Sequence, residues 1–495
     1  MTRVPHLTLI RPPLLIASSA VYPSRAAAPL GMAYVAAAVK KAGFAVSCID
    51  AYGLDMDHFS KFKDGTHING LSINAVIEQI SSDTDIIGLS TMFSNEWILI
   101  EELVNAIKKK YPLKMIILGG EHATSEYEYI LNSCQAVDGC ILGEGEQKTV
   151  DLLEAIKLQM SFENVEGFAH RCKVTNSVVI KSGLKRIKQI DEISWPLWEA
   201  IPLNKYLDGK VGFGISGTRA MPMLASRGCP YTCTFCSSPK MWTTSWKVRD
   251  VEDLIKEIKY YIHLYQIEHV EFYDLTAIIN KAWIQSFCRK LIEENLNITW
   301  SLPSGTRSEV LDDTTLKLLQ QSGIVKMTYS PESGSKKILK LIEKKVKLPK
   351  ILKSMRLAVK NKIVIKATLI SGFPEENFLD LFWNFVFITK LAIIGINDLA
   401  YFSFSPYPGS ALHDNLVKSG KIIKNKEYYE FLSVYVNNNS TKMKSWSEVI
   451  PSRLMPLITI GGMSYFYAIQ FLIRPWRIFS SIYRIVKDTP LTMFD

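Results

Sequence analysis

Three cysteines stand within eight residues in the stretch Cys229-Pro-Tyr-Thr-Cys233-Thr-Phe-Cys236. Because the spacing is three and then two residues, their thiolates can surround a small inorganic cluster from a single loop. Three protein ligands saturate three irons of a four-iron cluster and leave the fourth iron open for a substrate or cofactor. A structural zinc ion needs four closed ligands, and no fourth cysteine or histidine lies nearby in the sequence. The stretch therefore favours a [4Fe-4S] cluster over zinc or over reduced core cysteines.

The same stretch resembles the Cys-x-x-x-Cys-x-aromatic-Cys signature of the radical S-adenosylmethionine (SAM) enzymes. The resemblance implies that Cys229, Cys233 and Cys236 hold the cluster, and that the open iron chelates the amino and carboxylate groups of SAM. An electron from the cluster then splits the sulfonium and releases a 5′-deoxyadenosyl radical. Phe235, the aromatic residue of the signature, is expected to pack near the adenine. The signature specifies how the radical is made and not the product.

Length and composition indicate a folded protein of several domains. A chain of 495 residues can bury two or three substantial cores, and 27 Gly and 21 Pro are too few for a long disordered or repetitive segment. The formal charge of +10 suits nucleic acid, anionic lipid or an anionic substrate equally well. The remaining cysteines are dispersed in apolar contexts, as expected of buried thiols in a reducing compartment; they are Cys48, Cys134, Cys140, Cys172 and Cys288.

The N-terminus contains an apolar run, Leu14–Val21, followed by the alanines 26–28. Arg11 and Pro12-Pro13 interrupt that run, and Leu7–Ile10 already has the pattern of a buried strand. We therefore expect no signal peptide and a cytoplasmic protein.

Short apolar strands alternate with helical periods through residues 1–156, the predicted cobalamin-binding domain. The strands are expected at Leu7–Ile10, Ala45–Ile49, Ile86–Ser90, Met115–Leu118 and Gly139–Leu142, and the helices at Gly31–Ala42, Ile73–Ile80, Trp97–Tyr111 and Lys148–Ile156. This alternation predicts an α/β fold with a doubly wound, Rossmann-like parallel sheet. Ligands on such sheets bind at the loops that follow the strands' carboxyl ends.

Three of those loops have unusual sequences. Ser90-Thr-Met-Phe-Ser94 follows the third strand, Gly119-Gly120-Glu121-His122 the fourth, and Gly143-Glu144-Gly145-Glu146 the fifth. Paired glycines let the backbone approach a large flat ligand, although any one loop alone is explained as an ordinary turn. Together they resemble the cobalamin-binding domain of B12-dependent radical SAM enzymes. That resemblance implies cobalamin contacts from Ser90, Thr91, Gly119, Gly120, His122, Gly143, Glu144, Gly145 and Glu146.

Another cobalamin signature is missing from the chain. The Asp-x-His-x-x-Gly loop, whose histidine ligates cobalt from below, belongs after the first strand, and residues 11–29 contain no histidine. Asp57-His58 follows the second strand without the pattern and is expected to be a solvated loop. A cobalamin bound here should therefore lack a lower histidine ligand, with His122 lining the pocket.

Residues 157–220 are predicted to be a linker. Val165–His170 and Ser177–Lys181 suit a small hairpin, and the segment is assigned no chemistry.

Residues 221–410 contain six strand candidates, each followed by a helix. The strands are expected at Met221–Ala225, His269–Tyr273, Ile298–Leu302, Val325–Ser330, Val364–Ile370 and Asp398–Phe404. The series resembles the partial (β/α)6 TIM barrel of radical SAM enzymes, with chemistry at the strands' carboxyl ends.

Family positions at those strand ends imply contacts to SAM. Asp274 would contact the ammonium group, or would instead cap a helix. Arg307 would pair with the carboxylate, or would instead form a surface ion pair with Glu309. Glu332 would bind the ribose hydroxyls. Gly372–Glu375 and Pro406–Gly409 are expected to be pocket walls shaped by glycine and proline.

Residues 411–495 are predicted to be a helical C-terminal region. Leu454–Ile473 carries no charge and is long enough to span a bilayer, but Pro456 and Gln470 weaken that interpretation. Residues 474–487 mix aromatic and cationic side chains, as an interfacial helix would. We expect a helix that caps the barrel mouth, and keep peripheral membrane contact as the second interpretation.

The combined resemblance implies a cobalamin-dependent radical SAM enzyme, and the leading hypothesis is a C-methyltransferase acting on an unactivated carbon. In that family a 5′-deoxyadenosyl radical activates the substrate, which then takes a methyl group from methylcobalamin. The expected cofactors are a [4Fe-4S] cluster, SAM and cobalamin. The same architecture serves cyclases and rearranging enzymes that transfer no methyl group, so that alternative stays open. The catalytic residues are not indicated by any motif.

Two more distant alternatives come from other classes. An RNA-modifying methylthiotransferase would suit the positive charge, but it carries a second cysteine trio and a C-terminal β-barrel. Cys48, Cys134 and Cys140 lack that spacing, so no nucleic acid partner is expected. A non-catalytic cobalamin or metal sensor would leave the barrel's strand-end residues without a purpose. The expected partners are a hydrophobic small-molecule substrate, such as an isoprenoid or tetrapyrrole, and an electron donor such as flavodoxin or ferredoxin.

Overall fold

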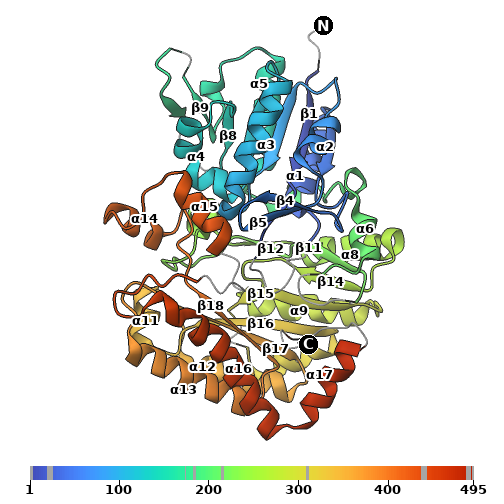
Figure 1. Cartoon of the computed structure of the whole chain (residues 1–495). Coiled ribbons are helices and arrows are strands. Elements are labelled where there is room, and N and C mark those ends of the chain that lie inside the picture. The colour runs from blue at the N-terminus through green and yellow to red at the C-terminus, as the bar shows by residue number, and fades with distance from the viewer. Residues whose placement is uncertain are drawn as a thin grey trace.

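The chain forms two α/β bodies stacked one above the other, with the N-terminal body at the top of Figure 1 and the barrel below it. The computed structural model describes residues 4–18, 26–172, 174–181, 186–212, 217–307, 311–435, 443–486 and 492.

The upper body is built on a seven-stranded sheet in the order β10-β9-β8-β7-β6-β1-β3. Its parallel strands are β1 (His6–Arg11), β3 (Ala45–Asp50), β6 (Ile86–Ser90), β7 (Met115–Gly119) and β8 (Gly139–Ile141), which confirms the predicted strands. Alternating strand residues face opposite sides, so two cores form. Helices α1 (Leu30–Lys41) and α5 (Gly145–Lys157) cover one side, and α2 (Ile73–Glu78), α3 (Trp97–Lys110) and α4 (Glu121–Ser133) the other.

The hairpin expected in the linker extends this sheet. Strand β9 (Phe168–Arg171) pairs antiparallel with β8, and β10 (Val178–Ile180) pairs antiparallel with β9. The sheet therefore continues beyond residue 156, and a connector begins only after β10. That connector contains α6 (Leu203–Asp208).

A second, three-stranded sheet of the upper body was not predicted. It is antiparallel, in the order β2 (Leu14–Ala17), β5 (Thr66–Asn69) and β4 (Phe59–Lys63). Asp64-Gly65, with Gly65 at φ +82°, turns the chain between β4 and β5. Asp-Gly between two alternating stretches is a strong hairpin signal, and it could have revealed this sheet. Asp57 and His58 are exposed ahead of β4, as expected.

The lower body is the predicted partial barrel. Its six parallel strands lie in sequence order: β11 (Ala220–Met223), β14 (His269–Phe272), β15 (Thr299–Thr306), β16 (Ile324–Glu332), β17 (Val364–Ser371) and β18 (Asp398–Ser403). The helices between them are α8 (Val251–Tyr265), α9 (Lys281–Glu293), α10 (Asp313–Gln321), α11 (Lys336–Leu341), α12 (Leu348–Lys360) and α13 (Phe378–Ile394). A two-stranded ribbon of β12 (Ser226–Arg227) and β13 (Lys247–Val248), with α7 (Ser238–Trp242) between, leaves β11.

The C-terminal helices divide between the two bodies. Helices α14 (Ala411–Lys418) and α15 (Lys426–Tyr435) rise to the upper body, where α15 contacts α3 and β2 (Figure 1). Helix α16 (Met455–Ile473) packs against α13 and the edge strand β18, and α17 (Trp476–Val486) follows it. Because α16 lies along the side of the barrel, the expectation that it caps the mouth is wrong. Its first residue, Met455, lies next to Gly372 at a strand end.

Candidate functional site

The cysteine loop starts directly after β12. Gly228 has φ +88°, and a Cβ there would lie 2.1 Å from the Ser245 carbonyl oxygen, so this turn requires glycine. The Cys236 amide donates to the Cys233 carbonyl at 3.1 Å, which folds the second half of the loop into a turn. All three thiols of the motif are half-buried. The local backbone thus gathers them at one end of the barrel.

The donor set fits an iron–sulfur cluster better than a single ion. In the part of the chain that the structure describes, no three His, Cys, Asp or Glu side chains converge on one ion position. A four-iron cluster places each thiolate on a different iron, so neighbouring thiols that do not converge are suitable. Burial raises the pKa of Cys229 and Cys233, and the positive charges of Lys344 and Arg307 act against that rise. The cations therefore favour the thiolates that a cluster needs.

Lys344 is a site residue that the sequence did not reveal. Its ammonium group pairs with Glu332 at 2.9 Å, and its positive charge acts on Cys233. Arg307 is buried, with its guanidinium 3.7 Å from the Tyr231 ring centroid, and it donates to the Lys345 carbonyl at 2.9 Å. The predicted alternative partner of Arg307, Glu309, lies outside the described residues. No motif marks Lys344, because it follows α11 among several other lysines.

Glu332 has an unusual backbone conformation. It ends β16 after a register shift relative to β17, and its φ is +66°, a conformation that costs a non-glycine residue free energy. The carboxylate is buried, and Thr368 donates to it at 3.5 Å. Such strain persists only where the surroundings hold it. Glu332 is thus fixed at the carboxyl end of the sheet, beside Lys344 and the cysteine loop.

Asp274 holds the chain that leads into the cysteine loop. Its carboxylate accepts hydrogen bonds from the Ser226 hydroxyl at 2.5 Å and the Ala225 amide at 3.0 Å. Burial raises the pKa of Asp274 to about 6. The helix-cap alternative is wrong, because α9 begins seven residues later and is capped by Asn280. The geometry gives Asp274 a positioning role through Ser226.

Phe235 belongs to an aromatic cluster at the barrel mouth. Its ring lies 6.2 Å from that of Phe373, which lies 4.8 Å from Phe404. Phe373 belongs to the 372–375 loop, so this loop does form a wall beside the cysteine motif.

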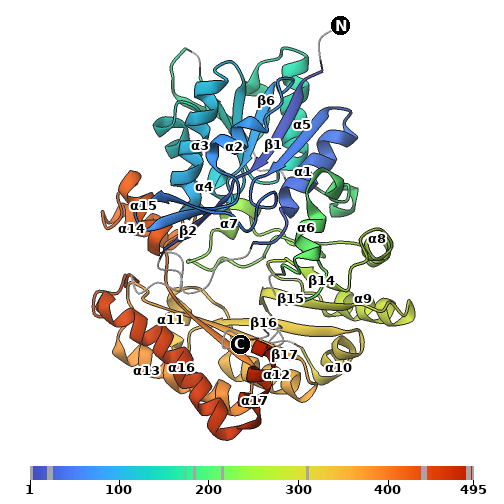
Figure 2. The same ribbon diagram turned by 45° about the vertical axis from the view of Figure 1, so that its right-hand side comes forward.

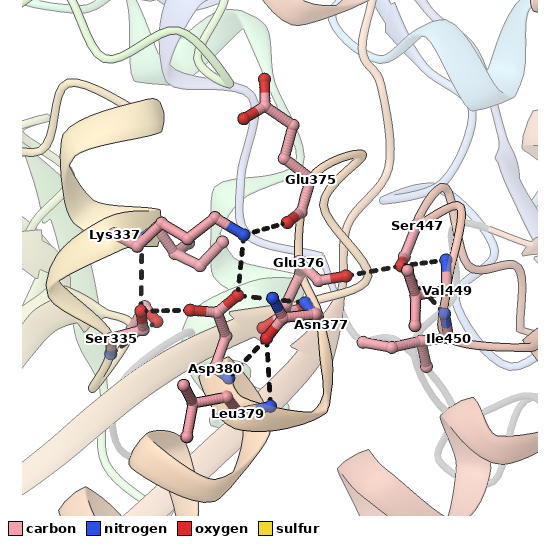
Figure 3. A network of polar contacts seen from close by, with 12 residues as sticks. Ser335, Lys337, Glu375, Glu376, Asn377, Leu379, Asp380, Ser447, Val449 and Ile450 are labelled. Atoms are coloured by element: carbon pink, nitrogen blue, oxygen red, sulfur yellow. Dashed lines mark hydrogen bonds and ion pairs between the residues drawn. The ribbon is translucent and has the colours of Figure 1, made fainter.

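A polar network fixes that wall (Figure 3). Lys337 donates to the Glu375 carbonyl at 2.6 Å and pairs with Asp380 at 3.2 Å, while Asn377 and Asp380 form a capping box at the start of α13. On the other side, the Ser447 hydroxyl donates to the Glu376 carbonyl at 2.6 Å. The network joins the ends of β16 and β17 to the C-terminal region and makes the mouth rigid.

The three glycine-rich or polar loops of the upper body meet at one edge of its sheet. The Thr91 amide donates to the Gly119 carbonyl at 2.7 Å, and the Gly143 amide donates to the Thr124 hydroxyl at 2.9 Å. Gly120 has φ +119°, and a Cβ there would lie 2.7 Å from the Thr91 carbonyl oxygen. Glycine at position 120 therefore lets the second loop pack directly on the backbone of the first. Ser90 lies at the same edge, at the end of β6.

Glu144 and Glu146 point to arginines. Glu144 pairs with Arg186 at 2.9 Å and Arg227 at 3.6 Å, and Glu146 pairs with Arg227 at 2.7 Å. All four side chains are at most 9% exposed, and the Arg227 guanidinium also lies 4.6 Å from the Tyr34 ring centroid. Because Arg227 directly precedes Gly228 and the cysteine motif, these ion pairs fasten the third loop of the upper body to the start of the cysteine loop.

A second contact fastens the other end of the cysteine loop. The Ser237 hydroxyl, next to Cys236, donates to the carboxylate of Glu121, which follows Gly120. Gly409 packs between Ser125 and Ser237, so the 406–409 loop lies beside the second half of the cysteine loop. The cysteine loop is therefore held at both ends by loops of the upper body.

Two family models match this chain in the order of its two bodies. The model of the B12 binding domain matches residues 25–153, and that of the radical SAM superfamily matches residues 223–382. The chain is a cobalamin-dependent radical SAM enzyme. The predicted resemblance is confirmed, and so are the three expected cofactors.

Known proteins similar to the enzyme include methyltransferases and a cyclase. An uncharacterised methyltransferase of Pyrococcus horikoshii is 26% identical over 80% of each chain. The anaerobic magnesium-protoporphyrin IX monomethyl ester cyclase of Rubrivivax gelatinosus is 25% identical over 73% of this chain and 63% of its own. The structure of the radical SAM methyltransferase TsrM from Kitasatospora setae superposes with a TM-score of 0.66 at 12% identity, covering 94% of this chain and 88% of that one. This likeness confirms the fold.

His122 is enclosed in aromatic side chains of the enzyme. Its ring centroid lies 5.3 Å from that of Trp97 and 5.6 Å from that of Tyr429, and its Nδ1 shares a hydrogen bond of 2.9 Å with the Ser94 hydroxyl. The imidazole is 1% exposed, which argues against the expected pocket-lining role as well as against ligation of cobalt. Because it lies between α3 and α15, His122 packs the second loop against these two helices.

The buried imidazole makes stability depend on pH. Burial lowers the pKa of His122 from 6.5 to about 3, so only the unfolded chain takes up this proton as pH falls below 6.5. The free energy of unfolding therefore has its full value above pH 6.5. Below that pH it falls by up to about 1.4 kcal/mol per pH unit. We expect His122→Gln, which does not titrate, to have a shallower decline in unfolding free energy, measured by urea titration between about pH 7.5 and 5. Parallel curves for the two proteins would contradict this.

Proposed function

We propose that the enzyme is a C-methyltransferase that acts on an unactivated carbon of a hydrophobic small molecule. The observation that carries the proposal is the attachment of the cysteine loop, at Arg227 and at Ser237, to two loops of the B12-binding body. Such attachment would hold a radical source and a methyl carrier next to the same substrate. The methyltransferase named for Pyrococcus horikoshii, which matches over 80% of each chain, adds support.

The proposed roles divide the site residues among the cofactors. Cys229, Cys233 and Cys236 would hold the [4Fe-4S] cluster. Glu332 would bind the SAM ribose, Phe235 would pack on the adenine, and Arg307 together with Lys344 would neutralise the SAM carboxylate. Asp274 would not contact the SAM ammonium group itself. It would position the backbone that does. Backbone and hydroxyl groups would hold cobalamin at Ser90, Thr91, Gly119, Gly120, Gly143 and Gly145, with Glu144, Glu146 and His122 supporting those loops.

When bound, the cluster and SAM supply the radical and cobalamin supplies the methyl carrier. The chain's own part is to orient them and to exclude water. The aromatic residues Phe235, Phe373 and Phe404 shield the barrel mouth, and the network around Asp380 keeps the wall in place. Exclusion of water protects a carbon radical from side reactions.

Three further features belong to the proposal. A flavodoxin or ferredoxin would reduce the cluster. All eight cysteines are free, which suits a reducing compartment and hence the cytoplasm. The C-terminal helices would make peripheral contact with a membrane.

The second candidate is a cyclase or rearranging enzyme that transfers no methyl group. The match to the Rubrivivax gelatinosus cyclase favours it. A methylthiotransferase is less suitable, because Cys48 lies on β3, Cys134 follows α4 and Cys140 lies on β8, without the spacing of a second cluster motif.

One experiment separates the two candidates. The enzyme is reconstituted anaerobically with iron, sulfide and cobalamin, and then incubated with deuterated-methyl SAM, a reductant and a metabolite extract. We expect mass spectrometry to show a product carrying the labelled methyl group together with 5′-deoxyadenosine. Formation of 5′-deoxyadenosine with an unlabelled product would favour the cyclase, and absence of 5′-deoxyadenosine would contradict both candidates.

A further inference from the structure

Helix α17 turns its apolar side to solvent and its polar side to the protein. Phe479, Tyr483 and Val486 are 72%, 64% and 76% exposed, whereas Ser481 is 5% exposed. On the inner side, Arg477 donates to the carbonyls of Gly395 and Ile396, both at 2.7 Å. A surface helix ordinarily buries its apolar side. Among the described residues, none covers the outer side of α17, which therefore suits an apolar environment.

The neighbouring helices extend this apolar surface. Leu457 and Leu472 on α16 are exposed, and so are Phe382 and Trp383 on α13. The two helices are joined side by side, with a hydrogen bond of 2.9 Å between the hydroxyls of Thr389 and Tyr465. All three helices lie at the end of the molecule away from the upper body (Figures 1 and 2). Exposed apolar surface on this scale marks a binding site for a protein or a membrane.

The charged residues within helices α12, α13, α16 and α17 are almost all positive. Helix α12, which packs against α13, carries four exposed cations: Lys350, Lys353, Arg356 and Lys360. Asp380 is the only acidic residue in helices α12, α13, α16 and α17, and it is buried. A second copy of the chain would bring cations against cations, whereas anionic lipid headgroups complement them. The surrounding charge therefore favours a bilayer over a dimer.

Helix α16 lies on the barrel in a way that excludes a span. Ser452–Ile473 is long and apolar enough to cross a bilayer, with a mean hydropathy of 1.4. However, Gln470 donates to the carbonyls of Ala392 and Ile396, both at 3.0 Å, and the Tyr467 hydroxyl donates to Asp398 at 2.7 Å. These bonds keep one side of α16 on the folded barrel. Shallow insertion of the outer side is the arrangement that remains.

We propose that helices α13, α16 and α17 dock the enzyme on the surface of a bilayer that contains anionic phospholipids. The aromatic and aliphatic side chains enter the interface, and the cations of α12 contact the headgroups. This deepens the proposed membrane contact, and it does not rest on methyl transfer.

Vesicle flotation of the full-length enzyme, loaded with cluster and cobalamin, tests the docking. We expect it to float with vesicles of phosphatidylcholine and phosphatidylglycerol, and to be released by high salt. Phe479→Glu combined with Tyr483→Glu places two negative charges on the outer side of α17. This double variant should bind vesicles at least tenfold more weakly, on the order expected for two charges brought to a bilayer. Leu113→Glu is the matched control, because Leu113 is 98% exposed but lies on the upper body, and it should float like the unaltered enzyme.

Formation of 5′-deoxyadenosine in solution should be the same for all three proteins, so failure of docking is distinguishable from failure of the radical chemistry. No flotation of the unaltered enzyme, or equal flotation of the double variant, would overturn the proposal. Flotation with neutral vesicles that salt does not affect would overturn the role of anionic lipid. The enzyme could instead fail to bind vesicles and form a dimer that the double variant Phe479→Glu and Tyr483→Glu dissociates. That result would show that a second copy of the chain covers this surface.

Discussion

Replacing Cys229, Cys233 or Cys236 by serine is expected to reduce 5′-deoxyadenosine formation to the level of a control without enzyme. A neutral hydroxyl is a poor ligand for iron, and with two thiolates the loop has too few ligands for a site-differentiated cluster. The thiols are half-buried, and serine is nearly the same size, so the fold should persist. The measurements are iron and sulfide content after anaerobic reconstitution, the brown absorption of the cluster, and 5′-deoxyadenosine by mass spectrometry.

Cys172→Ser provides the control for this series. Cys172 is also half-buried, but it follows β9 in the hairpin of the upper body. Its loss should change neither iron content nor 5′-deoxyadenosine. Retention of cluster and radical formation in a serine variant of Cys229, Cys233 or Cys236 would contradict the assignment of that cysteine as a ligand.

Strand patterning predicted the two α/β bodies because each buried parallel strand is a continuous apolar run between helices of regular period. The five parallel strands of the first domain and the six strands of the barrel were placed within a few residues. The sheet of β2, β4 and β5 was missed because its strands are short. Phe59–Lys63 is largely solvated, and Leu14–Ala17 is part of the apolar run Leu14–Val21, which has no strand pattern of its own.

The side-chain partners at the site were much less predictable. The Gly-Glu-Gly-Glu loop gave the position of Glu144 and Glu146, but their partners Arg186 and Arg227 are distant in sequence, so no local pattern could pair them. Lys344 was missed because nothing in the sequence distinguishes it from the neighbouring lysines. The outcome for α16 shows a related limit. Its composition suits a span, a cap or a packed helix equally, and the hydrogen bonds of Tyr467 and Gln470 to the barrel decide among them.

Arg227→Met is expected to destabilise the enzyme by about 3–5 kcal/mol, because removal of one partner from a buried ion pair leaves an uncompensated charge. Glu146, 9% exposed at the side chain, would lose its partner at 2.7 Å, whereas Glu144 would keep Arg186 and the Ile187 amide. Lys281→Met is the control. It removes an ion pair with Asp312 in which both side chains are 49% exposed, and such pairs contribute no more than about 1 kcal/mol. Urea unfolding of the apoproteins measures both changes.

A second substitution separates lost charge balance from lost attachment between the two bodies. Arg227→Met together with Glu146→Gln removes the uncompensated carboxylate, so it should recover much of the stability lost in Arg227→Met alone. It does not restore the link between the third loop and the cysteine loop. If that link positions the cofactors, the double variant should fold and bind the cluster. Its rate of methyl transfer should still fall behind its rate of 5′-deoxyadenosine formation, compared with the unaltered enzyme. Recovery of both stability and methyl transfer would show that Arg227 acts only as a counter-charge.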